Sequence, residues 1–317
     1  MLARSLFSSF SYMQSSQATQ EFPASADTHK MSDQLFAKYE EFKTRFHGNE
    51  GQAFIYDIIQ ELFNISSEIL KPANEVALKS MIPGKEYIGF ELGTRLSRAI
   101  NKNLFAVPDS YVADFLQKIK TNQIDSFSAE DITKICYKIA ISFCAAIDVI
   151  KSNDQKTPGT YFEYLMGQFF SSNLGVRPRK QVDVLNIENL NTRLPTDYIF
   201  DLGIGRAKYH VPVKTSTRER VIQVWAHQKV LDGIYGTGRF LGLLTCLSES
   251  KVDHKKFEVT EICLPDQWRI YQLFISQLKR IYYLDLPNKY AEMNTWYPPI
   301  HVQPFGTFFK EQAKLLE

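Results

Sequence analysis

The chain has 317 residues, of which 44% are hydrophobic, 13% aromatic and 23% charged. This is an ordinary globular composition, and the length suffices for one large domain or two of typical size. A formal net charge of +2 excludes a strongly basic, histone-like coat protein. The charge is unevenly distributed, because residues 151–317 carry a net charge of +5 and residues 1–150 carry −3. We therefore expect any anionic partner to bind the C-terminal half.

Cysteine usage and hydropathy narrow the class of protein further. The four cysteines are Cys136, Cys144, Cys246 and Cys263, and none of them lies in a Cys-x-x-Cys pair. This pattern argues against both a zinc site and a disulfide framework. No apolar run approaches the ~18–20 residues that a membrane span requires. We therefore expect a soluble, cytoplasmic protein with no membrane partner.

The N-terminal half shows mainly helical patterns. Residues 1–31 are expected to form a disordered tail, although the Ser-rich first 20 residues weakly resemble a transit peptide. Residues 32–150 are predicted to be a helical accessory region. Apolar residues recur there at three- and four-residue spacing over Asp33 to Phe46, Gln52 to Leu70, Gly89 to Asn101, Ser110 to Lys120 and Ala129 to Ile150.

The pattern changes after the polar stretch from Lys151 to Pro158, which is the predicted domain boundary. Residues 151–317 are predicted to form an α/β domain with a mixed sheet, because short strand-like runs alternate with amphipathic segments. The predicted helices cover Gly159 to Asn173, Thr217 to about Leu231 and Gln267 to Tyr282. The predicted strands cover Gln181 to Leu185, Asp197 to Leu202, Tyr209 to Val213 and Phe240 to Cys246.

Two of these strands are predicted to form a β-hairpin around the Gly-rich stretch from Gly203 to Ala207. If the turn centres between Gly205 and Arg206, then Asp197 faces Lys214 directly across the strands. The opposite face of the hairpin is expected to be buried, because its side chains are uniformly apolar. Those side chains are Tyr198, Phe200, Val211 and Val213.

The Asp197 and Lys214 pair allows two interpretations. A carboxylate can hold a hard divalent cation, and a neighbouring lysine can position a water or stabilise negative charge that develops on phosphorus. A plain cross-strand ion pair explains the same two residues equally well, and at a surface it is worth less than about 1 kcal/mol.

Charged residues near this hairpin point to nucleic-acid chemistry. Glu163, in the first turn of a predicted helix, is placed to join a metal site, although an acid that favours the helix dipole is the simpler interpretation. Arg218, Glu219 and Arg220 begin four residues after Lys214, where a helix is predicted to start. Arginine can donate two hydrogen bonds to guanine, and glutamate can accept one from cytosine. A solvated, charged first turn is the alternative.

Together these residues resemble type II restriction endonucleases of the PD-(D/E)XK superfamily, in particular the group that cuts at CCGG, CCNGG or CCWGG sequences. The resemblance covers roughly residues 157–228. It implies a nuclease core with a mixed central sheet flanked by helices, Mg²⁺ held by Asp197 with Glu163, and hydrolysis supported by Lys214. It also implies that Arg218, Glu219 and Arg220 read G·C pairs of double-stranded DNA. A homodimer in the cytoplasm of a prokaryotic cell, with a cognate DNA methyltransferase, is expected.

The sequence departs from the pattern of that superfamily at the second acid. The superfamily has an acid two residues before the lysine, where this chain has Pro212. The CCGG-type group instead has an acid about thirteen or fourteen residues downstream, where this chain has His227 and Gln228. Gln228 could offer a neutral oxygen to the metal, whereas the nitrogen of His227 is a poor match for Mg²⁺. A catalytically impaired DNA-binding protein and a repair or structure-selective nuclease are therefore the alternative functions.

Overall fold

The computed structural model describes residues 26–48, 52–187, 190–311 and 315. The helices are α1 (Ala26–His47), α2 (Gln52–Leu70), α3 (Lys102–Phe105), α4 (Asp109–Lys120), α5 (Ala129–Ile150), α6 (Lys156–Leu174), α7 (Ile222–Tyr235), α8 (Pro265–Phe274), α9 (Asn288–Ala291) and α10 (Thr307–Glu311), with 3₁₀ turns η1 (Arg218–Val221) and η2 (Glu292–Thr295). The strands are β1 (Asn74–Ser80), β2 (Tyr87–Leu92), β3 (Arg95–Leu96), β4 (Ile100–Asn101), β5 (Arg179–Ile187), β6 (Leu190–Phe200), β7 (Lys208–Val211), β8 (Val213–Lys214), β9 (Phe240–Cys246), β10 (Ser250–Asp253), β11 (Glu258–Glu261), β12 (Leu278–Tyr283) and β13 (Val302–Pro304).

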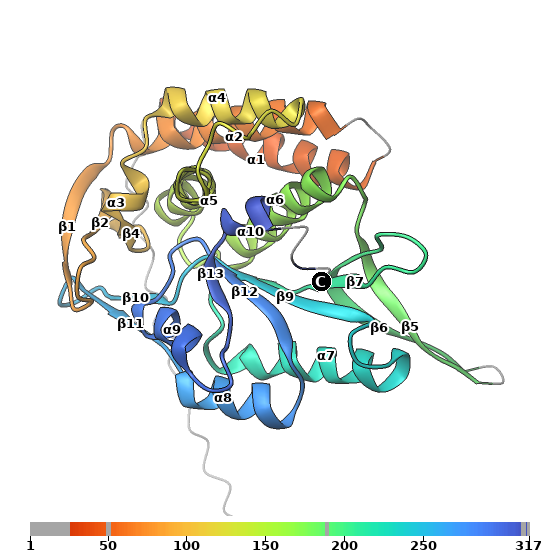
Figure 1. Ribbon diagram of the computed structural model, residues 1–317. Coiled ribbons are helices and arrows are strands. Elements are labelled where there is room, and N and C mark those ends of the chain that lie inside the picture. The colour runs from red at the N-terminus through yellow and green to blue at the C-terminus, as the bar shows by residue number, and fades with distance from the viewer. Residues whose placement is uncertain (1–25, 49–51, 188–189, 312–314, 316–317) are drawn as a thin grey trace, which may run out of the picture.

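The described residues form two sheets. The larger one has the strand order β13-β12-β9-β7-β6-β5, and β8 also pairs with β9. Its pairs are parallel from β13 to β7 and antiparallel from β7 to β5. Figure 1 shows α5 and α6 on one face of this sheet and α7 and α8 on the other. The predicted mixed sheet flanked by helices is therefore confirmed.

The middle strands of this sheet are apolar because helices cover both of their faces. In β9, every residue except the half-buried Leu241 is buried, and the predicted bounds of the strand are confirmed. The helix predicted over Gln267 to Tyr282 is wrong in its second half, because α8 ends at Phe274 and β12 begins at Leu278. A short apolar run that lies between two parallel strands cannot be distinguished from a buried helix by periodicity alone.

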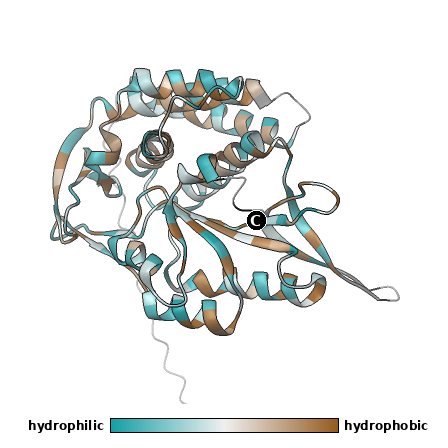
Figure 2. Ribbon diagram, in the orientation of Figure 1, coloured by the Kyte–Doolittle hydropathy of each residue, from teal (hydrophilic) through white to brown (hydrophobic). Residues whose placement is uncertain are grey.

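The N-terminal helices pack directly on the sheet domain. Side chains of α1, α2, α5 and α6 share one hydrophobic cluster with β6 and β7. The bounds predicted for α2 and α5 are confirmed, and α4 begins one residue earlier than predicted. Figure 2 shows hydrophobic and hydrophilic bands alternating along α4, the outermost of these helices. Residues 1–25 of the predicted tail lie outside the described residues, whereas Ala26 already begins α1.

The helix predicted from Gly89 to Asn101 is wrong, because β2, β3 and β4 occupy that segment. Gly93 has a φ of +64°, which suits the turn between β2 and β3. A Cβ at Gly89 would lie 2.8 Å from Leu96 Cδ1, so any larger residue there would require the Leu96 side chain to move. Residues 32–150 are consequently not all helical.

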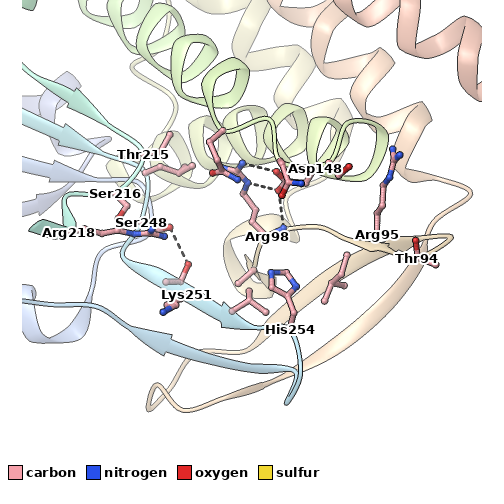
Figure 3. A pocket seen from close by; sticks show the side chains of 18 residues that line it. Thr94, Arg95, Arg98, Asp148, Thr215, Ser216, Arg218, Ser248, Lys251 and His254 are labelled. Atoms are coloured by element: carbon pink, nitrogen blue, oxygen red, sulfur yellow. Dashed lines mark hydrogen bonds and ion pairs between the residues drawn. The ribbon is translucent and has the colours of Figure 1, made fainter. Parts of the chain in front are cut away.

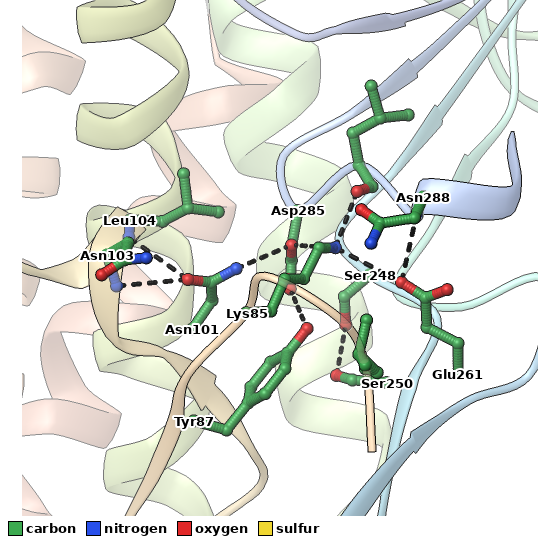
Figure 4. Close-up of polar contacts among 12 residues, drawn as sticks. Lys85, Tyr87, Asn101, Asn103, Leu104, Ser248, Ser250, Glu261, Asp285 and Asn288 are labelled. Carbon is green, nitrogen blue, oxygen red and sulfur yellow. Dashed lines mark hydrogen bonds and ion pairs between the residues drawn. The ribbon is translucent and has the colours of Figure 1, made fainter. Parts of the chain in front are cut away.

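These strands belong to a second sheet with the order β10-β11-β1-β2-β3, in which β4 pairs with β2. The two halves of the chain meet there, because β1 pairs in parallel with β11. Figure 4 shows the polar contacts beside it. The buried Asp285 carboxylate accepts hydrogen bonds from Lys85 Nζ at 2.8 Å, Tyr87 Oη at 3.0 Å and Asn101 Nδ2 at 3.0 Å. The division at residues 151–158 stays a prediction.

Among the described residues, no helix is both long enough and apolar enough to cross a lipid bilayer.

Candidate active site

The β6–β7 hairpin has a register two residues away from the predicted one. Ile199 pairs with His210, whereas the prediction paired it with Pro212. The turn centres on Ile204 and Gly205, closed by the Arg206 amide, which donates to the Gly203 carbonyl. Both glycines of the turn have positive φ, 105° and 80°, which places the centre of the turn earlier than expected. A shift of two residues leaves every side chain on its predicted face.

Asp197 and Lys214 are therefore still brought together. Lys214 Nζ donates to Asp197 Oδ2 at 2.7 Å, and the Val213 amide donates to the same oxygen at 2.8 Å. Pro212 has no amide hydrogen and interrupts β7, after which Val213 and Lys214 pair with β9. Both charged side chains remain partly exposed, at 23% for Asp197 and 33% for Lys214.

These two side chains open onto a cleft of about 170 Å³ between the hairpin and α7. Gln223 and His227 from α7 line it, and burial lowers the pKa of His227, which favours a neutral imidazole. Thr196 also lines it, and its buried hydroxyl has no hydrogen-bond partner among the described residues. The sequence analysis did not single out Gln223 or Thr196, because spacing alone does not reveal how α7 sits against the hairpin.

Gln228 does not reach this cleft, so its assignment as a metal ligand is corrected. The side chain is buried, and its Nε2 donates to the Phe240 carbonyl at 2.8 Å and to Asp232 Oδ1 at 3.0 Å. Its Oε1 lies 3.0 Å from His210 Nδ1. The residue thus fastens α7 to the sheet. Burial lowers the pKa of His210 to about 4.

Glu163 is likewise engaged away from the cleft. Lys180 Nζ of β5 lies 2.7 Å from Glu163 Oε1, and the Tyr198 hydroxyl donates to the Glu163 carbonyl at 3.1 Å. The Tyr198 side chain faces α6, and the side chain of Asp197, the residue before it, faces the opposite side of the sheet. The structure therefore pairs Glu163 with Lys180, and Glu163 does not line the cleft onto which Asp197 opens.

The donor atoms of the cleft fit Mg²⁺ if a substrate phosphate supplies further oxygen ligands. Mg²⁺ takes oxygen ligands and is commonly held by one or two carboxylates together with substrate phosphates and waters. Asp197 offers one carboxylate, whose Oδ1 accepts no hydrogen bond from the described residues. No group of three His, Cys, Asp or Glu side chains in the described part of the chain could enclose a metal ion. The residues present fit a cation that a substrate phosphate helps to hold.

Arg218 and Arg220 are exposed in η1, directly after the hairpin, and the side chain of Glu219 lies outside the described residues. Glu249, which the sequence analysis missed, anchors the preceding turn. Its buried carboxylate accepts hydrogen bonds from the Thr217 amide at 2.8 Å, the Thr217 hydroxyl at 2.6 Å, the Ser216 hydroxyl at 3.0 Å and the Tyr283 hydroxyl at 2.8 Å. Arg218 itself has a φ of +39°. The Arg-Glu-Arg segment thus follows a turn that these hydrogen bonds hold in place.

Comparison with solved structures identifies the fold. The chain is similar to the type IIP restriction endonuclease Kpn2I, with a TM-score of 0.75 and 24% sequence identity over 90% of this chain and 98% of that one. It is also weakly similar to the restriction endonuclease PspGI bound to substrate DNA, with a TM-score of 0.39 and 13% identity over 91% and 92% of the two chains. No protein-family profile and no curated protein matches the chain. The predicted PD-(D/E)XK nuclease fold, with its N-terminal helices, is confirmed by the match to Kpn2I.

Proposed function

We propose that this protein is a type II restriction endonuclease, which cleaves both strands of DNA at a G·C-rich palindrome of the CCGG or CCNGG kind in a Mg²⁺-dependent reaction. The observation that carries the proposal is the contact of Asp197 with Lys214 at the edge of a cleft, where Lys214 lies four residues before an Arg-Glu-Arg segment whose two arginines are exposed. The likeness of the whole fold to a type IIP restriction endonuclease supports the same function.

Each residue of the cleft has a role in this proposal. Bound Mg²⁺ would supply positive charge that stabilises the phosphate as it is attacked. The Asp197 carboxylate would hold the cation. Lys214 leaves the Asp197 carboxylate when the DNA phosphate arrives, and it then orients the attacking water and stabilises the negative charge on the phosphate. The neutral imidazole of His227 lies where it can accept a hydrogen bond from that water. A role for Glu163 requires its pair with Lys180 to open.

Recognition is proposed to come from the segment that follows the hairpin. Arg218 and Arg220 donate to guanine, and Glu219 accepts from cytosine, in the major groove. A palindromic target suits a two-fold symmetric homodimer in which each subunit cuts one strand. We also propose a cognate DNA methyltransferase in the same cell, since host DNA carrying the target sequence needs protection.

One observation favours a second function, a DNA-binding protein with impaired catalysis. The two positions at which the CCGG-type group carries an acid are His227 and Gln228 here, neither is a carboxylate, and Gln228 is buried in contacts with the sheet. A digest of a phage genome of known sequence, with Mg²⁺ present, separates the candidates. Discrete fragments support the endonuclease, an intact but retarded band supports the binding protein, and cleavage without a common sequence supports a repair or structure-selective nuclease.

A further inference from the structure

A second cleft, larger than that of the candidate active site, lies where the two halves of the chain meet. It has a volume of about 470 Å³ and begins one residue after Lys214, at Thr215. Figure 3 shows Arg95 and Arg98 entering it from the N-terminal half, and Arg218, Lys251 and His254 from the C-terminal half. The cleft thus lies between the Arg-Glu-Arg segment, which has a role in the proposed function, and the smaller sheet, which has none so far.

The charge that lines this cleft is strongly positive. Three arginines and one lysine line it, together with one acidic residue, Asp148. Arg98 neutralises that acid through two hydrogen bonds, from Nε at 2.7 Å and Nη2 at 2.9 Å. The remaining charge is that of Arg95, Arg218 and Lys251, a net +3 with His254 neutral. A cleft of this charge attracts an anion.

The cations of the cleft differ in how free they are to bind. Arg95 donates to the carbonyls of Val149 and Ile150 at the end of α5, so it is already held in place. Arg218 and Lys251 are exposed, and neither has an ion pair or a side-chain hydrogen bond among the described residues. Two unpaired cations that line the same cleft repel each other, and DNA whose bases meet Arg218 and whose backbone phosphate meets Lys251 would relieve that repulsion.

The position of the cleft selects the source of the phosphate. Arg218 belongs both to this cleft and to the segment proposed to read bases, so a duplex that reaches Arg218 passes beside Lys251. Hydroxyl groups of Thr94, Ser248 and Ser250 also line the cleft, and hydroxyls with lysine and arginine are the usual partners of the DNA backbone. Lys251 lies in β10, which pairs with β11, and β11 pairs in turn with β1 of the N-terminal half.

We propose that this cleft, defined by Arg95, Arg98, Arg218, Lys251 and His254, is a binding site for backbone phosphates of duplex DNA beside the bases read by the Arg-Glu-Arg segment. The inference rests on the proposed function, because it extends the same DNA-binding surface. It gives the N-terminal half a role, since β3 and the end of α5 form one wall of the site. Contacts of this kind position the duplex and carry no sequence information.

Lys251→Gln is the variant that tests this site, because the side chain is exposed and supports no other described contact. Affinity for a fluorescent duplex of mixed sequence is measured without divalent ions, so that the DNA stays intact, across a range of salt concentrations. The plot of log affinity against log salt has a negative slope, and loss of one phosphate contact is expected to make that slope shallower by about 0.9. The affinity deficit is then about 8-fold larger at about 0.1 M salt than at about 1 M.

Two further variants make the test specific. Lys251→Glu is expected to weaken binding more than Lys251→Gln at low salt, because it places a negative charge against the backbone. Lys118→Gln on α4 removes a positive charge from an outer helix that does not line the cleft, and it is expected to bind as the wild type does. An equal loss in Lys118→Gln would overturn the inference, because the effect would then be general attraction.

The remaining outcomes separate this inference from the proposed function. If the wild type binds duplex DNA and Lys251→Gln matches it in affinity and in salt slope, the inference fails and the proposed function stands. If the wild type binds no duplex DNA at all, both fail. If inorganic phosphate raises the melting temperature while Lys251→Gln leaves DNA binding unchanged, the cleft is a small-anion site and the inference is again overturned.

Discussion

Gln228 Oε1 lies 3.0 Å from His210 Nδ1, so one of the two residues at the expected second-acid positions is buried inside the protein. The amide nitrogen of Gln228 donates to the Phe240 carbonyl and to Asp232, which leaves its oxygen to accept from the imidazole. The proton of His210 is therefore on Nδ1. His227, one position earlier, lines the candidate active site instead.

Gln228→Glu and His227→Glu are therefore expected to behave differently. The first change removes the donor to the Phe240 carbonyl and sets a carboxylate against Asp232, which should lower the free energy of unfolding by about 1–3 kcal/mol. The second adds a carboxylate to the active-site cleft. It should lower the Mg²⁺ concentration needed for half-maximal cleavage. Urea unfolding and a Mg²⁺ titration of cleavage measure the two effects, and better cleavage at low Mg²⁺ by Gln228→Glu would refute this assignment.

The buried His210 should make stability depend on pH. Its pKa is about 4 in the folded protein, against an ordinary value of 6.5, because burial disfavours the charged ring. Between these values the unfolded chain binds a proton that the folded protein does not bind. Stability is therefore fully present above about pH 6.5 and falls by roughly 3 kcal/mol as the pH drops toward 4.

His210→Asn tests this dependence, because an amide can still donate to Gln228 and does not titrate. Urea unfolding at a series of pH values should show a smaller loss of stability below pH 6.5 in the variant than in the wild type. His254→Asn, at an exposed histidine, is the matched control and should keep the wild-type dependence. Identical pH profiles for His210→Asn and the wild type would show that His210 is not the titrating group.

Glu249 is expected to act on DNA binding through the turn that it anchors. Glu249→Ala leaves the Thr217 amide and the Tyr283 hydroxyl without their acceptor, at a cost of about 1–3 kcal/mol for each buried group. Glu249→Gln keeps an acceptor oxygen and should retain most of the affinity. The ratio of specific to mixed-sequence DNA binding is the measurement, and an equal ratio in Glu249→Ala and Glu249→Gln would contradict the anchoring role.

Burial also raises the pKa of Glu249, although its hydrogen bonds partly oppose the shift. In the pH range above the ordinary carboxyl pKa, the folded protein then holds a proton that the unfolded chain has lost. Its contribution to stability therefore declines as the pH rises through that range. Glu249→Gln should lack this decline in urea unfolding measured across the same range, and an unchanged decline would assign it to another group.

Lys85→Met should destabilise the contact between the two halves of the chain. It leaves Asp285, whose side chain is 3% exposed, as a buried charge without its ion-pair partner. Removing one partner of a buried pair typically costs about 3–5 kcal/mol. Lys79→Met, at the exposed pair with Glu258 on the same sheet, should cost less than about 1 kcal/mol. Thermal and urea unfolding compare them, and equal costs would mean that the buried pair contributes no more than the surface pair.

The sequence predicted the features that depend on local pattern. The long helices α2 and α5, the apolar strand β9 and the shared face of Asp197 and Lys214 all follow from periodicity, and a two-residue error in register does not change that face. The roles proposed for Asp197, Lys214 and the Arg-Glu-Arg segment stay predictions.

Features that depend on long-range packing could not be predicted in this way. The pairing of β1 with β11 joins residues far apart in the sequence, and the segment with helical spacing forms β2, β3 and β4 of the same sheet. The pairing of Glu163 with Lys180, the burial of Gln228 and the anchoring by Glu249 depend on neighbours brought by other elements. Spacing contains no information about such neighbours.

The central claim, that Asp197 and Lys214 form a catalytic pair, has a matched control on the same hairpin. Asp201, directly after the end of β6, forms an ion pair with Lys208 of β7 at the same 2.7 Å separation, and neither residue lines the active-site cleft. Asp197→Asn or Lys214→Gln would remove the cation ligand or the charge that stabilises the phosphate, whereas Asp201→Asn and Lys208→Gln would remove only a surface pair.

The most direct measurement is the single-turnover rate of DNA cleavage with Mg²⁺ for all four variants and the wild type, together with their affinity for the same DNA. We expect discrete fragments from the wild type and from the Asp201→Asn and Lys208→Gln variants. We expect no cleavage, with DNA binding retained, from Asp197→Asn and Lys214→Gln. Cleavage at the wild-type rate by either of these last two variants would contradict a catalytic role for the Asp197–Lys214 pair.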